Sequence, residues 1–362
     1  MSLSVDVIQT ALRGVIDPNT GKDLVTTKSA RNVRVDGTDV SVDVELGYPA
    51  LSQIDDIRRA VIAAIRAVPG VGNVSANVYQ KIVAHAVQRG VKVMPNVRNI
   101  IAVASGKGGV GKSTTAANLA LALAAEGASV GMLDADIYGP SQPTMLGASG
   151  KPESRDGKTL EPTISHGIQI SSIGFLIEPD TPMVWRGPMV TQALEQLLRD
   201  TNWTDLDYLV VDMPPGTGDI HLTLSQKIPV TGAVIVTTPQ DIALLDARKG
   251  LKMFEKVGIP ILGIIENMAM HTCSKCGHSE HIFGQGGGER MAKDYGIEYL
   301  GGLPLDIRIR EQADSGRPTV VADPQGPLAD TYRRIARRVA VKIADQARDM
   351  SLKFPSIVVQ NT

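Results

Sequence analysis

The sequence predicts an α/β protein in which a domain with a mostly parallel sheet follows a small α+β domain. From residue 100 onward, continuous apolar runs alternate with helical segments, a pattern typical of strands covered on both faces. The first 82 residues instead contain a strand in which polar and apolar residues alternate. The length of 362 residues also favours about two domains.

The composition excludes several classes of protein. Hydrophobic residues make up 43% and charged residues 21%, as in ordinary folded proteins, so general disorder is excluded. A net charge of −1 disfavours a dedicated nucleic-acid binder, and two cysteines cannot build a disulfide scaffold. The sequence contains neither a secretory signal nor an apolar run of about 18 residues. We therefore expect a cytoplasmic protein that binds no nucleic acid and no membrane.

Residues 1–82 are expected to form a small α+β domain. After the Asp36-Gly37 turn, valines alternate with polar residues, which indicates one half-buried strand of a hairpin. Isoleucines and Val61 then recur at helical spacing until Pro69-Gly70. The predicted order is a helix at 4–14, a hairpin at 31–46, a helix at 51–67 and a strand at 71–82.

Residues 83–99 have no clear period and contain Gly90 and Pro95, so we predict a linker. Residues 100–349 are expected to form one domain that ends in an amphipathic helix at 328–349, and residues 350–362 a loose tail. The apolar strands of this domain are predicted at 100–104, 129–133, 208–211, 233–237 and 261–265.

The first of these strands leads directly into a G-x-x-x-x-G-K-S sequence and then a helix. Glycines let the backbone N–H groups of such a loop converge on phosphate oxygens, and the helix N-terminus adds a positive dipole end. Lys112 would contact the β- and γ-phosphates, and the Ser113 hydroxyl would bind Mg²⁺. Lys107 is a second cation within the loop. The candidate nucleotide-binding residues here are Gly106, Lys107, Gly108, Gly109, Val110, Gly111, Lys112, Ser113 and Thr114.

Aspartates follow two neighbouring apolar strands. Asp134 and Asp136 come after one strand, and Asp212 comes after another. Carboxylates at the carboxyl ends of strands beside a P-loop hold Mg²⁺ and its waters. Asp212 is the better candidate for Mg²⁺, and Asp136 could orient the attacking water. The Pro- and Gly-rich residues 214–218 could respond to the γ-phosphate as a switch loop.

Both cysteines lie in one C-x₂-C segment, Cys273 and Cys276. Three interpretations are open: a redox pair, a zinc site, or half of an iron–sulfur site. A zinc site would use Cys273, Cys276, His278 and His281. An iron–sulfur cluster typically needs four thiolates, which two chains related by a two-fold axis could supply.

These motifs resemble one family. The loop with its extra lysine at 107 resembles the deviant Walker A loop of the MinD/ParA/NifH group of dimeric P-loop ATPases. The segments 134–141, 213–219 and 266–268 are similar to those of the Mrp/ApbC/Nbp branch, the ATP-binding iron–sulfur cluster carriers. The resemblance covers roughly residues 95–345. Residues 1–82 resemble the small iron–sulfur-assembly domain often fused to this branch, although Tyr48 stands where some such domains carry a cysteine.

The resemblance implies a slow, Mg²⁺-dependent ATPase. Lys112 and Lys107 would contact phosphates, the latter across a homodimer, and Asp136 would position the hydrolytic water. Asn267 would contact adenine, so ATP is favoured over GTP. Cys273 and Cys276 of two chains would hold a bridging [4Fe–4S] cluster for delivery to apo iron–sulfur proteins, and an assembly scaffold would be a further partner.

Two other functions compete with the carrier. One is a MinD/ParA-like positioning ATPase with a structural zinc site, for which a membrane-seeking or DNA-binding C-terminal helix would be diagnostic. The helix at 328–349 is basic and amphipathic, although its small apolar face favours packing within the domain. The other is a reductase that retains its cluster, as the nitrogenase iron protein does.

Overall fold

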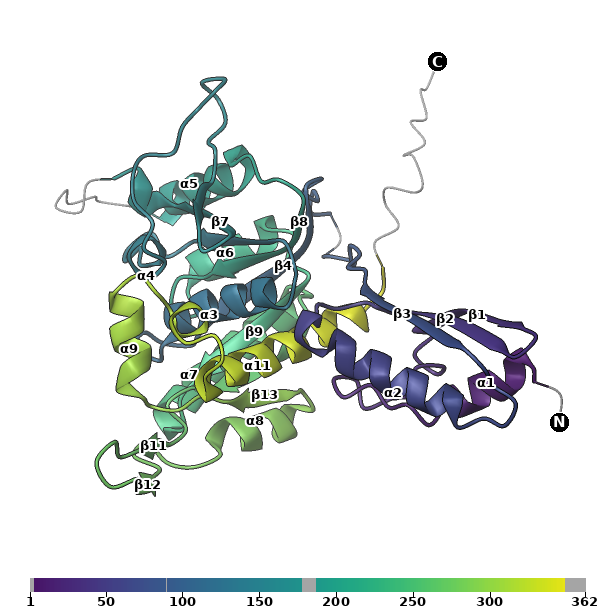
Figure 1. The fold of residues 1–362 in the computed structure, drawn as a ribbon. Coiled ribbons are helices and arrows are strands. Elements are labelled where there is room, and N and C mark those ends of the chain that lie inside the picture. The colour runs from purple at the N-terminus through teal and green to yellow at the C-terminus, as the bar shows by residue number, and fades with distance from the viewer. Residues whose placement is uncertain (1–2, 89, 178–186, 349–362) are drawn as a thin grey trace, which may run out of the picture.

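The computed structural model describes residues 3–88, 90–177 and 187–348. Figure 1 shows a small N-terminal part with its own sheet beside a larger part in which helices surround a central sheet. This arrangement confirms the predicted fold class, a mostly parallel α/β part preceded by a small α+β part. The tail predicted at 350–362 lies outside the described residues.

The small part has the predicted order of elements. Helix α1 begins after Ser4, whose hydroxyl accepts a hydrogen bond from the Val7 amide, and buries Ile8 and Leu12. The predicted hairpin is confirmed, because β1 pairs antiparallel with β2, and β3 then joins β2 in parallel. The elements are α1 (Val5–Leu12), β1 (Ala30–Asp36), β2 (Asp39–Leu46), η1 (Leu51–Gln53), α2 (Ile54–Arg66) and β3 (Val74–Gln80).

The large part is built on an eight-stranded sheet in the order β13-β10-β9-β4-β8-β5-β7-β6. All its neighbouring strands are parallel except β6 and β7. The five predicted apolar strands are its centre. The strands are β4 (Val97–Ala104), β5 (Val130–Asp134), β6 (Thr163–Ser165), β7 (Ile168–Ser172), β8 (Leu206–Asp212), β9 (Gly232–Thr237), β10 (Ile261–Glu266) and β13 (Tyr299–Gly302).

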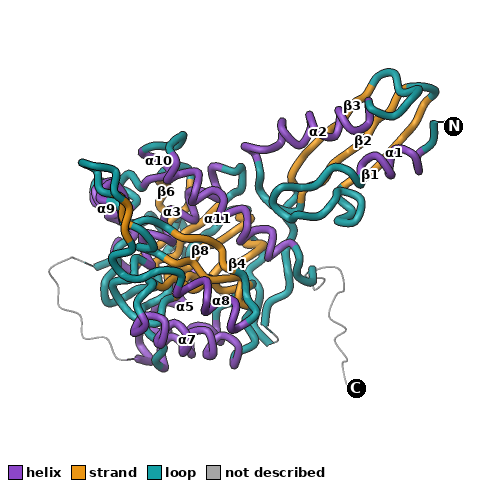
Figure 2. The backbone as a smooth tube through the Cα atoms, turned by 90° about the horizontal axis from the view of Figure 1, so that it is seen from below, coloured by secondary structure: helices purple, strands orange, loops and turns teal. Residues whose placement is uncertain are grey.

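Helices cover both faces of this sheet, which explains why its central strands are apolar throughout (Figure 2). Alternate residues of β4 belong to different cores: Ile101 packs with α3 and α11, and Ile100 packs with α5, α6, α7 and α8. The helical elements are α3 (Lys112–Ala125), α4 (Gln142–Met145), η2 (Ile173–Phe175), α5 (Gly187–Asp200), α6 (Asp219–Lys227), α7 (Asp241–Lys256), α8 (Gly287–Tyr295), α9 (Ile307–Asp314), α10 (Thr319–Ala322) and α11 (Pro327–Ala344).

The segment predicted as a linker is attached to the large part over much of its length. Strand β4 begins at Val97, so the last three residues of the segment belong to the sheet. His85 is buried, with its Nδ1 3.0 Å from Asn99 Oδ1. The Gln88 amide donates to two backbone carbonyls near the end of α6, at 2.7 and 3.1 Å. These polar contacts explain why a sequence without periodicity is nevertheless ordered against the sheet.

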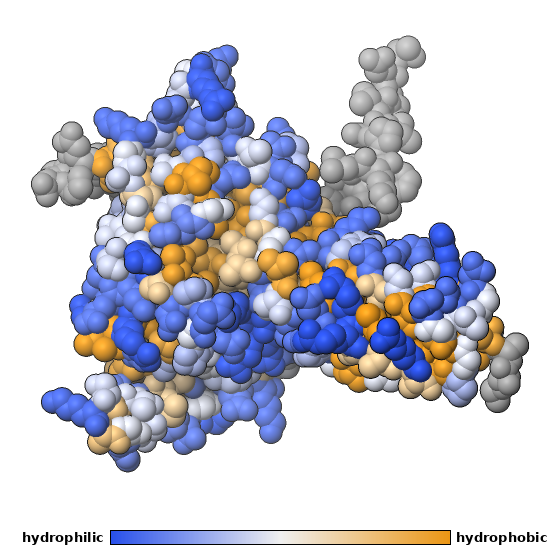
Figure 3. Space-filling view, in the orientation of Figure 1, coloured by the Kyte–Doolittle hydropathy of each residue, from blue (hydrophilic) through white to orange (hydrophobic). Residues whose placement is uncertain are grey.

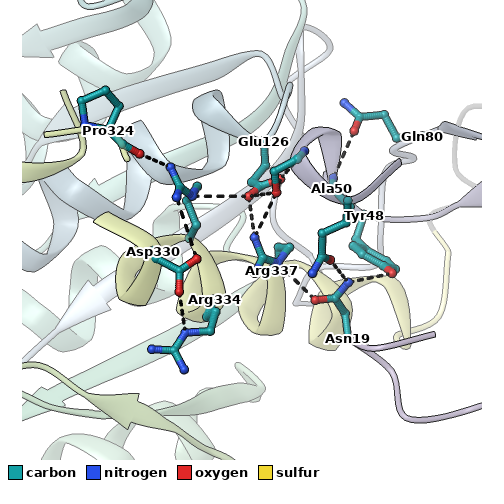
Figure 4. Close-up of polar contacts among 12 residues, drawn as sticks. Asn19, Tyr48, Ala50, Gln80, Glu126, Pro324, Asp330, Arg334 and Arg337 are labelled. Carbon is teal, nitrogen blue, oxygen red and sulfur yellow. Dashed lines mark hydrogen bonds and ion pairs between the residues drawn. The ribbon is translucent and has the colours of Figure 1, made fainter. Parts of the chain in front are cut away.

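A buried ion pair of the large part lies where the small part contacts it (Figure 4). Glu126, at the C-terminal end of α3, contacts Arg337 of α11 at 2.5 Å, and both are almost fully buried. Ser52 of the small part donates its amide and hydroxyl to the same carboxylate, and Asn19 accepts from the Arg337 Nε at 3.1 Å. The small part is therefore fastened to the end of the helix that begins at the P-loop.

Helix α11 packs as the sequence favoured, within the large part. Its apolar residues Tyr332, Ile335, Val339 and Ile343 are buried, and α3 lies against it. Its basic residues pair with carboxylates, as Arg338 and Lys342 do with Glu298 at 2.8 and 3.1 Å. No helix in the described ranges is long and apolar enough to cross a membrane.

Candidate nucleotide and metal site

The P-loop connects β4 to α3 at the carboxyl edge of the sheet. Two glycines of this loop are required by its shape. A Cβ on Gly106 would lie 2.1 Å from the backbone carbon of Asp246 in α7. Gly111 has a φ of +79°, and its Cβ would lie 2.1 Å from the Asn267 amide nitrogen. The loop therefore curls tightly between α7 and the end of β10. Its backbone amides lie directly before the N-terminus of α3.

The structure brings four predicted site residues together. The ammonium of Lys112 forms an ion pair with Asp212 and lies 3.8 Å from Asp136 and 3.2 Å from the Ser113 hydroxyl. Lys112 and Asp212 are nearly fully buried. The pKa of Asp136 is raised by burial, an effect that the Lys112 charge opposes. The cluster thus contains one cationic side chain and two carboxylates. A bound metal cation would compensate the remaining negative charge.

Gln142, at the start of α4, completes this cluster, and our sequence analysis did not identify it. Its Nε2 donates to Asp212 at 2.9 Å and to the Ser113 carbonyl at 3.0 Å. Its Oε1 is buried and has no hydrogen-bond partner within the described part of the chain. The only sequence signal is its place directly after the segment 134–141, because its partners lie far away along the chain.

Three hydrogen-bond donors hold the carboxylate of Asp134 beside this cluster. Its carboxylate accepts from the amides of Asp136 and Gln142 and from the Ser172 hydroxyl, at 3.0 to 3.2 Å. Burial, together with the neighbouring Asp212 charge, nevertheless raises the pKa of Asp134 to about 7. Asp134 therefore orients the loop that carries Asp136 and Gln142.

The segment predicted as a switch loop, residues 214–218, lies against the P-loop. The Gly216 amide donates to the Ser105 carbonyl at 3.0 Å. His221 follows on α6 and is buried against Phe254, with ring centroids 5.6 Å apart. Burial lowers the pKa of His221 to about 4, so its ring is neutral at pH 7. It is a packing residue.

Asn267 borders a cavity beside the P-loop. Its amide nitrogen donates to the Val110 carbonyl at 2.9 Å, which joins the end of β10 to the loop. The cavity has a volume of about 220 Å³ and is lined by Gly111, Thr114, Asn267, Leu305, Asp306 and Tyr332, among others. A mostly apolar cavity with amide and carboxylate groups at its wall suits a planar heterocycle next to a phosphate-binding loop.

Lys107 lies half-buried in the loop, and its ammonium has no hydrogen bond or ion pair to any residue that the structure describes. The helix against this loop, α7, carries two exposed apolar side chains, Ile242 at 69% and Leu245 at 54% exposure. Exposed apolar residues beside an unpaired cation suit a surface that another protein chain covers.

The two cysteines lie on a separate hairpin, formed by β11 (His271–Thr272) and β12 (Ser279–Glu280), that projects from the large part. In Figure 3 this projection stands at the lower left, with polar and weakly apolar atoms mixed on its surface. The Cys273 amide donates to the His278 carbonyl, and the Gly277 amide donates to the Cys273 carbonyl, each at 2.8 Å. Cys276 is exposed and Cys273 partly so.

The turn favours the thiolate form of Cys273. Hydrogen bonds from the amides of Lys275 and Cys276, and then from the Cys276 side chain, lower the pKa of the Cys273 thiol. Metals and clusters bind thiolates. Within the described ranges, no three His, Cys, Asp or Glu side chains come together in a way that could hold a metal ion. The four residues considered for zinc therefore do not form such a group, and His281 Nδ1 instead bonds to the Ala269 carbonyl at 2.7 Å.

Strand, glycine-rich loop, helix and strand-end carboxylates together define a P-loop nucleoside triphosphatase. A family model described as "NUBPL iron-transfer P-loop NTPase" matches residues 96–340, and one described as "Iron-sulfur cluster assembly protein" matches residues 6–78. The chain belongs to this family of iron-transfer P-loop NTPases.

The curated relatives of this chain include proteins named as iron–sulfur cluster carriers or transfer proteins. The chain is 52% identical to the iron–sulfur cluster carrier protein of Escherichia coli, over 90% of this chain and 89% of the relative. It is 61% identical to the carrier of Pseudomonas fragi, over 75% of this chain and 96% of the relative. It is 52% identical to the mouse iron–sulfur cluster transfer protein NUBPL, over 70% of this chain and 80% of the relative.

Solved structures share the fold of the large part. A nucleotide-binding protein from Archaeoglobus fulgidus, in complex with ADP, has a TM-score of 0.55 and 38% identity, over 64% of this chain and 91% of that one. The cell-division ATPase MinD of Pyrococcus furiosus has a TM-score of 0.51 at 23% identity, over 67% of this chain and 98% of that one, a likeness of fold alone.

Proposed function

We propose that this protein is an ATP-dependent carrier of iron–sulfur clusters, a homodimer that holds a [4Fe–4S] cluster between the cysteine pairs of two chains and delivers it to apo iron–sulfur proteins. The observation that carries the proposal is the short connection between its two sites. Asn267, bonded to the P-loop, precedes Cys273 by only six residues. The relatives named as cluster carriers and the iron-transfer family model support the same function.

The nucleotide roles follow from the cluster of charges. The amides of residues 106–114 and the Lys112 ammonium would bind the phosphates, and Asp136 would orient the attacking water. The residues present fit Mg²⁺, because Ser113 and Asp212 offer the oxygen ligands it prefers and the buried Gln142 Oε1 has no hydrogen-bond partner among the described residues. Mg²⁺ would neutralise charge that develops on the phosphates. The cavity beside Asn267 would take the adenine of ATP.

The number of thiolate ligands in each chain supports the homodimer. One chain supplies two thiolates on a projecting hairpin, whereas a four-iron cluster is usually held by four. The exposed Ile242 and Leu245 beside the P-loop supply an apolar surface that a second copy would cover. In that dimer Lys107 would reach the partner's phosphates, so one interface would hold both nucleotide and cluster.

The remaining expectations belong to the same proposal. We infer a slow ATPase of the cytoplasm that receives its cluster from an assembly scaffold. ATP binding or hydrolysis would control loading or release because it favours one of two dimer arrangements. Neither a nucleic acid nor a membrane is needed as a partner.

Transfer of a cluster to an apo-enzyme tests the proposal. The protein is reconstituted anaerobically and mixed with an apo [4Fe–4S] enzyme whose activity reports the cluster it receives. Wild type and Ser274→Ala, a change in the exposed turn between the cysteines, should restore activity. Cys276→Ser should restore less than about a tenth as much, because one thiolate per chain cannot retain the cluster. Equal recovery with Cys276→Ser would overturn the proposal.

A further inference from the structure

The cysteine hairpin is the continuation of a two-stranded ribbon that extends beyond the central sheet. The chain from Glu266, the last residue of β10, to His271 bonds to residues 303–305, which follow β13. The Leu303 amide donates to the Glu266 carbonyl, the Ala269 amide to the Leu303 carbonyl and the Leu305 amide to the Met270 carbonyl, at 2.8 to 2.9 Å. The ribbon therefore links the sheet to the hairpin through these bonds, with a turn at residues 267–268 where Met268 has a φ of +55°.

The same ribbon forms one wall of the cavity beside the P-loop. Asn267 and Met268 line the cavity from one strand of the ribbon, and Pro304, Leu305 and Asp306 line it from the other. A ligand in the cavity thus touches the ribbon on both strands. A displacement of Leu305 would also displace the residues at the base of the hairpin.

His271 makes the last contact between the cavity wall and the hairpin. It is the first residue of β11, and its Nδ1 lies 3.0 Å from the Leu305 carbonyl. Because a carbonyl only accepts hydrogen bonds, Nδ1 carries the proton and donates it. Cys273 follows two residues later. The side chain therefore joins a cavity-lining residue to the strand that carries the first cysteine.

We propose that His271 is a positioning residue that couples occupancy of the nucleotide cavity to the geometry of the cysteine pair. The inference rests on the proposed function for what the two sites bind, but the coupling itself belongs to the cluster-free chain. A ligand that fits better against one position of Leu305 shifts the hairpin with it, because the Nδ1 hydrogen bond keeps the two together. Without that bond, only the backbone contact between Leu305 and Met270–His271 links the hairpin to this wall of the cavity, so the hairpin follows Leu305 less closely.

His281 provides a matched control in the same hairpin. Its Nδ1 also bonds to a ribbon carbonyl, that of Ala269 at 2.7 Å. Ala269, however, is not among the residues that line the cavity. Removing the His281 side chain loosens the base of the hairpin without cutting the link from Leu305.

Alkylation of the cysteines tests this coupling in full-length, cluster-free, reduced protein. The chain has only two cysteines, so iodoacetamide labelling can be followed at each one by peptide mass spectrometry. Saturating Mg-ADP should change the labelling rate of wild type by about fivefold, the lower end of ordinary couplings between sites. In His271→Ala this ratio should fall to about 1, while the Kd for ADP stays within about twofold.

The variant His271→Asn should restore the wild-type ratio, because its amide nitrogen can occupy the position of Nδ1, and His281→Ala should retain it. The proposal is overturned if wild type responds to ADP with no change in rate, if His271→Ala keeps the wild-type ratio, or if His281→Ala loses it equally. None of these outcomes depends on a cluster, so failure of the carrier function would be seen separately, in the transfer experiment.

Discussion

At the scale of single residues, the site is a set of charges that compensate one another. Lys112 neutralises Asp212, and the Gln142 amide supports the same carboxylate from the other side. The sequence predicted Lys112, Asp136 and Asp212 because each follows a recognisable strand or loop. It could not predict Gln142, whose role depends on a contact 70 residues away along the chain. An amide becomes a site residue only through such tertiary contacts.

Asp134 should make the folded protein less stable as the pH rises, the opposite of the usual effect of a carboxylate. Its pKa is raised from 3.8 to about 7 by burial and by Asp212. Between these values the folded protein binds more protons than the unfolded chain, so the free energy of unfolding falls as the pH rises. Relative to Asp134→Asn, wild type should lose up to about 1.4 kcal/mol per pH unit in this window. Urea unfolding at pH 5, 6 and 7 measures the difference, and parallel profiles for the two proteins would contradict it.

At the scale of elements, the continuous apolar strands were the most predictable feature, because burial on both faces leaves a strong signal. The two edge strands, β6 and β13, and the neighbouring strand β7 were not predicted. β13 (Tyr299–Gly302) ends in two glycines, and β6 has only three residues. Neither strand therefore contains an apolar run long enough to be recognised in the sequence. The start of β4 was also missed, because Arg98 and Asn99 are polar yet pair with Asp207 and His85.

The pair between α3 and α11 should be a large single contribution to stability. Arg337→Met removes the nearer cation of the buried Glu126 and leaves only Arg333, 4.0 Å away, and breaking a buried pair in this way costs about 3–5 kcal/mol. Arg334→Met, in the same helix, removes only an exposed pair with Asp330 at 3.2 Å and should cost less than about 1 kcal/mol. Urea unfolding at pH 7 compares them. Equal losses in the two variants would show that the buried pair has no special role.

At the scale of the whole molecule, one helix runs from the P-loop to the contact between the large part and the small part. α3 begins at Lys112 in the P-loop and ends beside Glu126, where Ser52 of the small part is bound (Figure 4). The sequence indicated two parts and a linker, but it gave no sign of this contact, because Glu126 and Arg337 look like ordinary surface charges on amphipathic helices. Burial of both charges is decided by how the helices meet.

The hairpin is the other feature that concerns the whole molecule. Cysteine spacing alone left zinc, redox and cluster chemistry open. The structure adds that the two thiols stand on a projection and that no described third ligand joins them. In the proposed carrier, a complete cluster site would use two chains, so the state of assembly and the metal content would change together.

Native mass spectrometry of the anaerobically reconstituted protein therefore tests the central claim most directly. We predict a dimer that carries about four iron and four sulfide ions, and a Cys276→Ser variant that carries neither. A monomer with one zinc ion per chain, or a cluster that persists in Cys276→Ser, would contradict the account.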